Sequence, residues 1–248
     1  MKWFLSASLF FLLVFIFPFG LMAENYLSEA DAPYDQGGIE NYKRSIDLYL
    51  KALEANPNDY EANWKCARAY MGYGKEAKKQ NAEDWKDICA RYGKEGMKYA
   101  QKAIEQEPNK PEGHYYYGLN VGIYSSGVSL LTALKEGLKD KAQSGFERAY
   151  ELDKMYDNAS PILALGRFWA IIPWPFKDKQ KALRYYREYQ ATEYFAKGAK
   201  GKIYLAELLL KLDRKENKAE VKALLEKVAQ SDDKYFSDRA NSLLAKIN

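Results

Sequence analysis

Apolar residues recur at spacings of three and four along nearly the whole sequence. This period is typical of amphipathic helices, in which one stripe of side chains faces the core. The sequence has no alternating β-branched runs and no Asn-Gly hairpin turns, which would indicate strands. The pattern therefore predicts an all-α protein.

One phrase of this helical pattern repeats. The phrase begins with a small residue and has an aromatic residue or alanine four positions later. Three positions after that comes another apolar residue, which is alanine in the best copies. In those copies a proline follows after five more positions. The two best copies are SIDLYLKALEANP at residues 45–57 and GMKYAQKAIEQEP at residues 96–108. A third copy at residues 142–154 ends in lysine, and weaker copies follow at residues 182–189 and 221–228.

The phrase resembles the second helix of a tetratricopeptide repeat, and the segments YEANWKCARAY and EGHYYYGLNVG resemble the first helix. Small residues on one helix let the aromatic residues of its neighbour pack closely, and each pair buries its remaining apolar face on the next pair. The sequence therefore predicts a tetratricopeptide-like helical-repeat solenoid of about four to five helix pairs. We expect it to form a single domain over residues 39–248.

The repeats are longer than the standard unit of about 34 residues. Counted between equivalent positions from Ala52 onward, the four spacings are 51, 46, 40 and 39 residues. We expect the surplus between the first and second helix of each pair, where the connections line one edge of a solenoid and often bind partners. The Pro-Trp-Pro loop at residues 173–175 belongs to this edge because neither proline can donate to a helix ladder. Asp178 is placed to cap the helix that follows.

The N-terminus differs in composition from the rest of the chain. Lys2 precedes an apolar run at residues 3–17. Residues 1–23 therefore predict a secretory signal peptide, or an uncleaved inner-membrane anchor, and residues 24–38 a flexible lead-in. Either alternative predicts a periplasmic or otherwise exported domain, facing the periplasm and touching a membrane only through residues 1–23.

Composition argues against several classes of function. The formal net charge of +4 falls to +3 without Lys2, which is too balanced to favour a nucleic-acid partner. His114 is the only histidine, so no histidine pair is available for a metal. Neither a G-x-S-x-G phrase nor a phosphate-binding loop occurs in the sequence. We therefore expect a protein that is not an enzyme and uses no cofactor or metal.

Cys66 and Cys89 flank a predicted helical turn near residues 75–81. They lie 12 and 11 residues from its centre, which places them at matched height in an antiparallel helix pair. A disulfide can form there in an oxidising compartment. The alternative is two buried free thiols.

Tyr116, Asn120 and Tyr124 lie on one predicted helix, beside a face kept bare by small residues at every fourth position. This face suits close packing against another helix. It also suits the floor of a ligand cavity that the three side chains surround. Both interpretations stay open from the sequence.

Arg167 and the aromatic residues of the Pro-Trp-Pro loop are the other candidates for binding. Arg167 interrupts an apolar stretch at residues 162–172, so it needs an acidic partner or a ligand carboxylate. The acidic partners that we expect are Glu147, Glu151 and Asp153. Trp174 and Phe176 either fold back to cap the preceding helix or stay exposed as an anchor for a partner.

Two phrases within residues 112–190 carry a further resemblance: Tyr-Tyr-Tyr-Gly in EGHYYYGLNVGIYSSG and Leu-Gly-Arg in ASPILALGRFW, with their spacing. They are similar to the T-component proteins of tripartite ATP-independent periplasmic (TRAP) transporters. The resemblance implies a periplasmic protein that partners a solute-binding protein, with an organic acid as the ligand. Two features depart from that family: no lipid-accepting cysteine follows the apolar run, and the Pro-Trp-Pro-Phe loop does not match it.

These features predict an exported, non-catalytic helical-repeat adaptor that binds another envelope protein. The resemblance implies that this partner is the solute-binding component of a TRAP-type transporter. One alternative is a carrier of a small organic acid with an internal cavity lined by Tyr116, Asn120, Arg167 and Trp174. Another is a structural scaffold for envelope assembly. An open concave face with an exposed Trp174 would favour the adaptor, and a closed aromatic cavity around Arg167 would favour the carrier.

Overall fold

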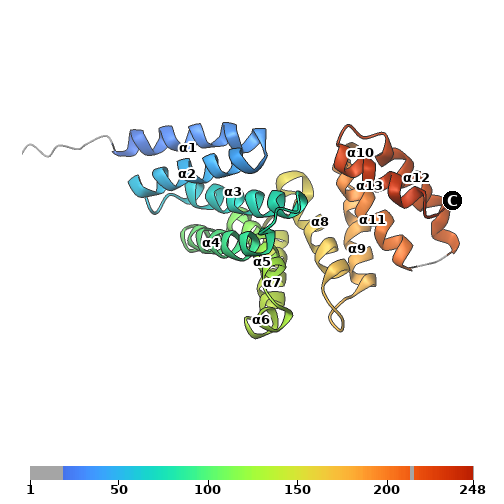
Figure 1. Cartoon of the computed structure of the whole chain (residues 1–248). Coiled ribbons are helices and arrows are strands. Elements are labelled where there is room, and N and C mark those ends of the chain that lie inside the picture. Colours follow the sequence, from blue (N-terminus) through green and yellow to red (C-terminus); the bar gives the residue numbers. More distant parts are fainter. Residues whose placement is uncertain (1–18, 213–214, 248) are drawn as a thin grey trace, which may run out of the picture.

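The computed structural model describes residues 19–212 and 215–247. Every regular element in these ranges is helical, and no strand occurs in them (Figure 1). The elements are α1 (Phe19–Gln36), α2 (Ile39–Ala55), α3 (Tyr60–Lys79), α4 (Trp85–Gln106), α5 (Pro111–Gly127), α6 (Leu130–Lys135), α7 (Leu138–Asp153), α8 (Tyr156–Ile171), α9 (Lys179–Gln190), α10 (Glu193–Lys197), α11 (Ala199–Leu212), the 3₁₀ turn η1 (Lys215–Asn217), α12 (Lys218–Ala229) and α13 (Lys234–Leu244). The predicted all-α class is confirmed.

The helices pack as a chain of neighbouring pairs. α1 packs on α2, α3 on α4, α5 on α7, α8 on α9, and α11 on α12, and α13 covers the last pair. Figure 1 shows α1–α7 gathered in one part of the molecule and α9–α13 in another, with α8 between them. This arrangement is the predicted helical-repeat solenoid.

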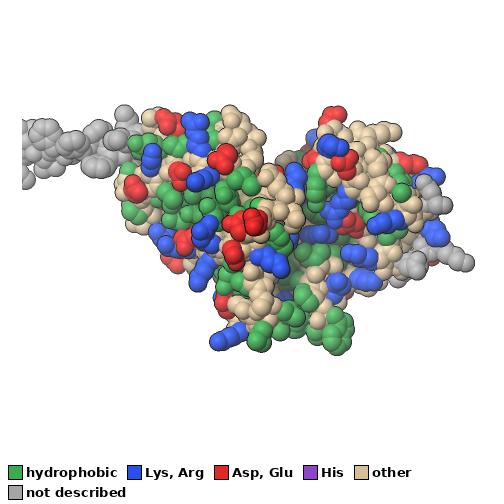
Figure 2. Space-filling view, viewed as in Figure 1, with side chains coloured by type: hydrophobic (Ala, Val, Ile, Leu, Met, Phe, Trp, Pro, Cys, Tyr) green, Lys and Arg blue, Asp and Glu red, His purple; other side chains and the backbone are tan. Residues whose placement is uncertain are grey.

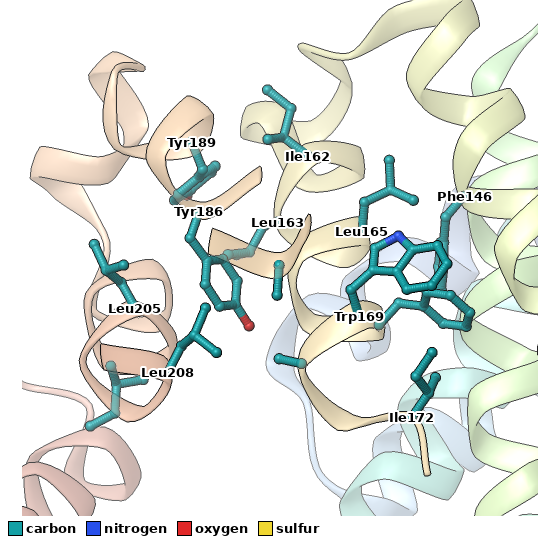
Figure 3. Packing of buried hydrophobic residues seen from close by; sticks show 14 of the residues in the cluster. Phe146, Ile162, Leu163, Leu165, Trp169, Ile172, Tyr186, Tyr189, Leu205 and Leu208 are labelled. Carbon is teal, nitrogen blue, oxygen red and sulfur yellow. The ribbon is translucent and has the colours of Figure 1, made fainter. Parts of the chain in front are cut away.

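Small residues on the first helix of a pair receive an aromatic ring from the second helix. A Cβ atom on Gly118 of α5 would lie 2.7 Å from the Phe146 ring of α7, and one on Gly166 of α8 would lie 2.5 Å from the Tyr186 ring of α9. Both rings are buried, and Figure 3 shows Tyr186 extending from α9 toward Leu208 of α11. The repeating phrase therefore predicts core positions because it encodes this close helix packing.

The surplus residues of the long repeats take two forms. In the third repeat the connection between α5 and α7 holds the short helix α6, as predicted. In the second repeat α3 and α4 are themselves extended, to 20 and 22 residues, and the connection at residues 80–84 is short. The prediction of a long connection is wrong there. Buried residues continue along α3 to Ala77 and begin again in α4 at Ile88, so the additional helical turns pack against each other.

Residues 24–36, expected as part of a flexible lead-in, form most of α1. Ala30 is fully buried, and Tyr26, Leu27 and Tyr34 pack against the apolar cluster of α2 and α3. The expectation was wrong because α1 buries only a narrow face, which leaves a weak apolar period in the sequence. The lead-in between α1 and α2 is reduced to a glycine turn at residues 37–38.

The predicted signal peptide or anchor at residues 1–23 lies outside the described residues, except for the backbone of residues 19–23, which begins α1. Across residues 19–212 and 215–247, no helix is long and apolar enough to cross a membrane. Both predictions for the N-terminal segment therefore stay predictions.

A polar network fixes α1 to α2 and α3. The Asp31 carboxylate accepts hydrogen bonds from Lys65 Nζ and Tyr49 Oη, each at 2.6 Å, and from Arg68 at 3.1 Å. Burial alone would raise the pKa of Asp31, but the hydrogen bonds and positive charges around it outweigh burial. The pKa of Asp31 therefore lies below its ordinary value of 3.8.

Replacing Asp31 by asparagine is expected to destabilise the chain at neutral pH and to lose this effect in acid. A carboxyl group whose pKa is lowered by folding contributes stability above its unfolded pKa, and the contribution is lost as the pH falls through the folded pKa. The difference between the urea midpoints of the wild type and Asp31→Asn should therefore be largest near neutral pH and should disappear as the pH falls below 3.8. A gap that stays constant in acid would show that the charge of Asp31 does not hold α1.

Cys66 and Cys89 are buried free thiols, so the disulfide is not formed in the structure. The turn between α3 and α4 lies at residues 80–84, which places Cys66 16 residues from its centre and Cys89 only 7. At 1.5 Å of rise per residue, the two differ in height by about 13 Å. The Cys89 thiol instead donates to the backbone oxygen of Gly74, at 3.4 Å.

Candidate functional site

The surface is hollowed between the α1–α7 part and the α9–α13 part, and Lys and Arg side chains gather along it (Figure 2). We call this region the hollow and define it by Asp157 and the groups whose charges act together with it: Tyr34, Arg68, Tyr156 and Lys200, with Lys75 acting on Lys200. At its rim, Lys79 Nζ of α3 lies 5.3 Å from the centroid of the Tyr235 ring of α13. The curved path of the solenoid therefore brings the last helix, α13, back to α3.

An unusual turn begins α8. Asp157, Asn158 and Ala159 have φ values of 46°, 60° and 60°, all in the left-handed region. Each non-glycine residue in this region costs about 1–2 kcal/mol, so the surrounding packing must hold the turn. Ala159 is fully buried and its N–H donates to the backbone oxygen of Met155 at 3.0 Å. The turn redirects the chain from α7 into α8 and places Asp157 among groups of several other helices.

Asp157 has electrostatic neighbours on five other helices, including Tyr115 of α5. Its charge acts on Tyr34 of α1, Arg68 of α3, Tyr189 of α9 and Lys200 of α11. Burial raises the pKa of Asp157, although a hydrogen bond from Ser160 and the charges of Lys200 and Arg68 oppose the shift. Segments far apart in the sequence thus converge on this carboxylate.

Aromatic rings form the wall of the hollow on the α1–α5 side. The Trp64 ring stacks on Tyr116, with centroids 5.7 Å apart and planes 8° apart. The Arg68 guanidinium lies 3.8 Å from the centroid of the Tyr34 ring, a distance at which a cation and a ring attract. The wall is therefore rigid, because each of these rings is held by a neighbour.

Lys75 of α3 and Lys200 of α11 lie close enough for the charge of one to act on the other. Burial among the helices and then the positive charge of Lys75 lower the pKa of Lys200 to about 8, whereas Asp157 acts in the opposite direction. Lys200 still keeps solvent-exposed surface, so a ligand can reach it. Two ammonium groups held near each other favour an anionic group between them.

Arg167 is bound to Glu207 of α11, at 3.2 Å, rather than to Glu147, Glu151 or Asp153. The expected partners were wrong because they lie on α7, whereas Arg167 turns toward the next pair of helices. Its guanidinium also lies 4.5 Å from the centroid of the Tyr204 ring. A salt bridge, not a free ligand-binding arginine, is what the structure contains.

Arg239 of α13 binds the same carboxylate of Glu207. The guanidinium of Arg239 also lies 5.9 Å from the centroid of the Tyr204 ring. Glu207 therefore joins α8 to α13 through one nearly buried carboxylate.

Tyr116, Asn120 and Tyr124 pack between helices. Asn120 is fully buried and its Nδ2 donates to the backbone oxygens of Ala67 and Tyr116, both at 2.9 Å. Tyr124 is buried and donates to Glu136 at 3.0 Å. Of the three, Tyr116 touches the hollow, through its side-chain hydrogen bond with Tyr156. The close-packing interpretation of this helix describes the structure.

Trp174 is 88% exposed and Phe176 41% exposed, so Trp174 does not cap the preceding helix. Backbone hydrogen bonds close the loop instead: the Phe176 N–H donates to Pro173 and the Asp178 N–H donates to Trp169. Asp178 caps α9 as predicted, because its carboxylate accepts from the N–H of Lys181 at 2.8 Å. The structure does not bring Trp174 together with Tyr116, Asn120 and Arg167.

Sequence reasoning missed most of the hollow. Lys75 and Lys200 are ordinary charged residues on helix faces, and no local pattern sets them apart. One signal was available at Asp157 and Asn158, because aspartate and asparagine tolerate the left-handed conformation best after glycine. In residues 19–212 and 215–247, no group of three or more His, Cys, Asp or Glu side chains is placed to hold a metal ion.

Comparisons with known proteins agree with this fold. The structure resembles TTC0263, a tetratricopeptide-repeat protein of Thermus thermophilus, with a TM-score of 0.64, 19% identity, and coverage of 90% of this chain and 99% of that one. It also resembles the MamA protein, with a TM-score of 0.53, 19% identity, and coverage of 84% and 92%. These likenesses establish the tetratricopeptide-repeat fold.

Sequence comparison adds a family to this fold. No curated protein matches the chain. One family pattern does match, over residues 26–169, which include α2–α7 and most of α1 and α8. Since this match spans more than half of the sequence, the chain belongs to the family described as Regulator of microtubule dynamics protein 1-3.

Proposed function

We propose that the protein is a non-catalytic adaptor whose hollow binds an acidic segment of a protein partner. The observation that carries the proposal is the placement of Lys75 of α3 and Lys200 of α11, which lie close enough for the charge of Lys75 to add to the burial that lowers the pKa of Lys200 to about 8. A carboxylate between them would replace a repulsion by two charge-assisted hydrogen bonds.

The surroundings of the lysines suit an extended peptide better than a small acid. Tyr34 and Trp64 both keep part of their surface exposed and lie next to Arg68, so they add apolar contact beside an acidic residue. The hollow is open to solvent on the face in Figure 2, whereas a carrier of a small molecule encloses its ligand. The exposure of Trp174 likewise supports the adaptor over the carrier.

Two classes of partner fit this chemistry. The family name associates its members with microtubule dynamics, which makes a microtubule protein one candidate. The predicted export and the resemblance to TRAP T-components make an envelope solute-binding protein the other. Both would present an acidic segment to the same hollow, so one experiment distinguishes them by the mass of the protein captured.

A photo-crosslinking amino acid placed at Lys200 of the full chain, in the source cells, tests the proposal. The control carries the same group at Lys234, which is highly exposed on α13 and pairs with Asp238 of its own helix. A discrete protein adduct at position 200 that is absent at position 234 is expected. Equal adducts at both positions, or none at position 200, would reject the hollow as the binding site.

Binding at the hollow is expected to weaken as the pH rises through about 8, the pKa of free Lys200. An acidic ligand favours the charged ammonium, so the complex binds a proton that the free protein loses above this pH. Calorimetry with a short oligoglutamate peptide should show proton uptake near pH 8, and Lys200→Glu should weaken binding by about tenfold or more. Binding that is unchanged by pH and by Lys200→Glu would mean that Lys200 does not contact the acid.

A further inference from the structure

Exposed apolar side chains are concentrated at one edge of the molecule. Of the nine large apolar residues that are exposed in the described part of the chain, six lie on α6, at the last residue of α8 or on the loop after it. We call these six the apolar edge: Leu130, Leu131, Leu134, Ile171, Trp174 and Phe176. Leu131 is 77% exposed and Trp174 88%. Proteins rarely leave so many large apolar side chains together without a binding role.

The two segments of the apolar edge lie at the same end of the solenoid. Lys139 near the start of α7, four residues beyond the end of α6, reaches over the Phe176 ring, with Nζ 5.5 Å from its centroid. The loop therefore lies beside the part of the chain that directly follows α6. In Figure 1 both α6 and the loop between α8 and α9 project at the lower edge of the view. Figure 2 shows apolar side chains gathered along that edge. The apolar edge is therefore a projecting surface and not a groove.

Basic residues flank the apolar edge in the sequence. Residues 129–141 and 171–181 contain six lysines and three acidic residues. The acids are already engaged: Glu136 accepts from Tyr124, Asp140 pairs with Lys139, and Asp178 caps α9. Lys139, Lys179 and Lys181 are engaged as well, with Asp140, the Lys211 backbone oxygen and Glu147. Lys135, Lys141 and Lys177 are exposed, so their positive charges remain beside the apolar edge and favour an anionic surface.

We propose that the apolar edge inserts into the headgroup region of an anionic lipid bilayer. Leucine and tryptophan side chains next to lysines are the combination that binds at a membrane interface, where apolar groups reach the acyl boundary and ammonium groups meet lipid phosphates. A projecting edge can enter a bilayer without any rearrangement of the fold, whereas it offers no cleft to a protein partner. This contact is separate from the hollow and from the apolar segment at residues 1–23.

A local probe separates this contact from any binding through residues 1–23. We would replace Leu131 by cysteine in the full chain and label it with an environment-sensitive nitrobenzoxadiazole dye, since Cys66 and Cys89 are buried. The matched control is Tyr235→Cys, an exposed aromatic position on α13. Vesicles of phosphatidylcholine alone and of phosphatidylcholine with phosphatidylserine would be compared.

The dye at position 131 should brighten with the phosphatidylserine vesicles and the dye at position 235 should not. Adding Trp174→Lys should weaken the response at position 131 by about tenfold, because a buried ring is replaced by a charge. An equal response at both positions, or none at position 131, would overturn the proposal. A response that grows with protein concentration without lipid would also overturn it, since a second copy would then cover the edge.

Discussion

Replacing Gly93 by alanine is expected to lower the free energy of unfolding by about 3 kcal/mol. A Cβ atom on Gly93 of α4 would lie 2.4 Å from the backbone nitrogen of Tyr124 on α5 and 2.7 Å from its Cα. A flexible side chain can move away from such a contact, but a helix backbone cannot. The substitution therefore forces α4 and α5 apart, and urea unfolding followed by circular dichroism measures the loss.

Gly122→Ala is the control for this prediction. It lies on α5, one of the two helices that the Gly93 substitution separates, but a Cβ atom there would meet nothing within 4 Å. Alanine at an exposed helix position is expected to stabilise the chain by about 0.5–1 kcal/mol relative to glycine. A similar loss of stability in both variants would show that helix propensity, and not the close approach of α4 and α5, explains the result at Gly93.

The contrast between Gly93 and Gly122 shows how far the sequence predicts the fold. The repeating phrase predicts helices and core residues, such as Tyr49 and Tyr186, because helix packing is encoded within a few turns. The sequence does not distinguish a glycine under a neighbouring backbone from one that faces solvent, since both lie on helices near other glycines. That difference depends on the angle at which two helices cross.

The hollow was harder to predict than the fold. Lys75 and Lys200 are 125 residues apart, and they approach only because each repeat adds a small rotation to the solenoid. The left-handed turn at residues 157–159 also changes the direction of the chain. The spacing of apolar residues in the sequence does not predict this turn. Trp174 was conspicuous in the sequence because two prolines isolate it, but only the structure shows that its ring is exposed.

The position of Lys200 also depends on how α11 is held, and the carboxylate of Glu207 is central to this. Replacing Glu207 by glutamine is expected to lower the free energy of unfolding by about 2 kcal/mol. Glu207 is nearly buried and binds both Arg167 and Arg239, which flank the Tyr204 ring. Glutamine has no charge, so two guanidinium groups would remain close together without a carboxylate between them. The effect is smaller than for a fully buried pair because both arginines keep some contact with solvent.

Glu226→Gln provides the matched control, because Glu226 pairs with Lys222 on the surface of α12, where both side chains are more than half exposed. Its loss is expected to cost less than about 0.5 kcal/mol.

Hydrogen exchange should show faster opening of α11 and α13 in Glu207→Gln and unchanged exchange in α3 and α4, since only the former helices share the carboxylate. Uniformly faster exchange in all helices would mean that the chain unfolds as one unit. Equal stability of the two variants would mean that Glu207 does not hold α8, α11 and α13 together. If Glu207→Gln loosens α11 without changing the groups of the hollow, it should also weaken oligoglutamate binding at Lys200, and thereby connect the rigidity of the C-terminal helices to binding.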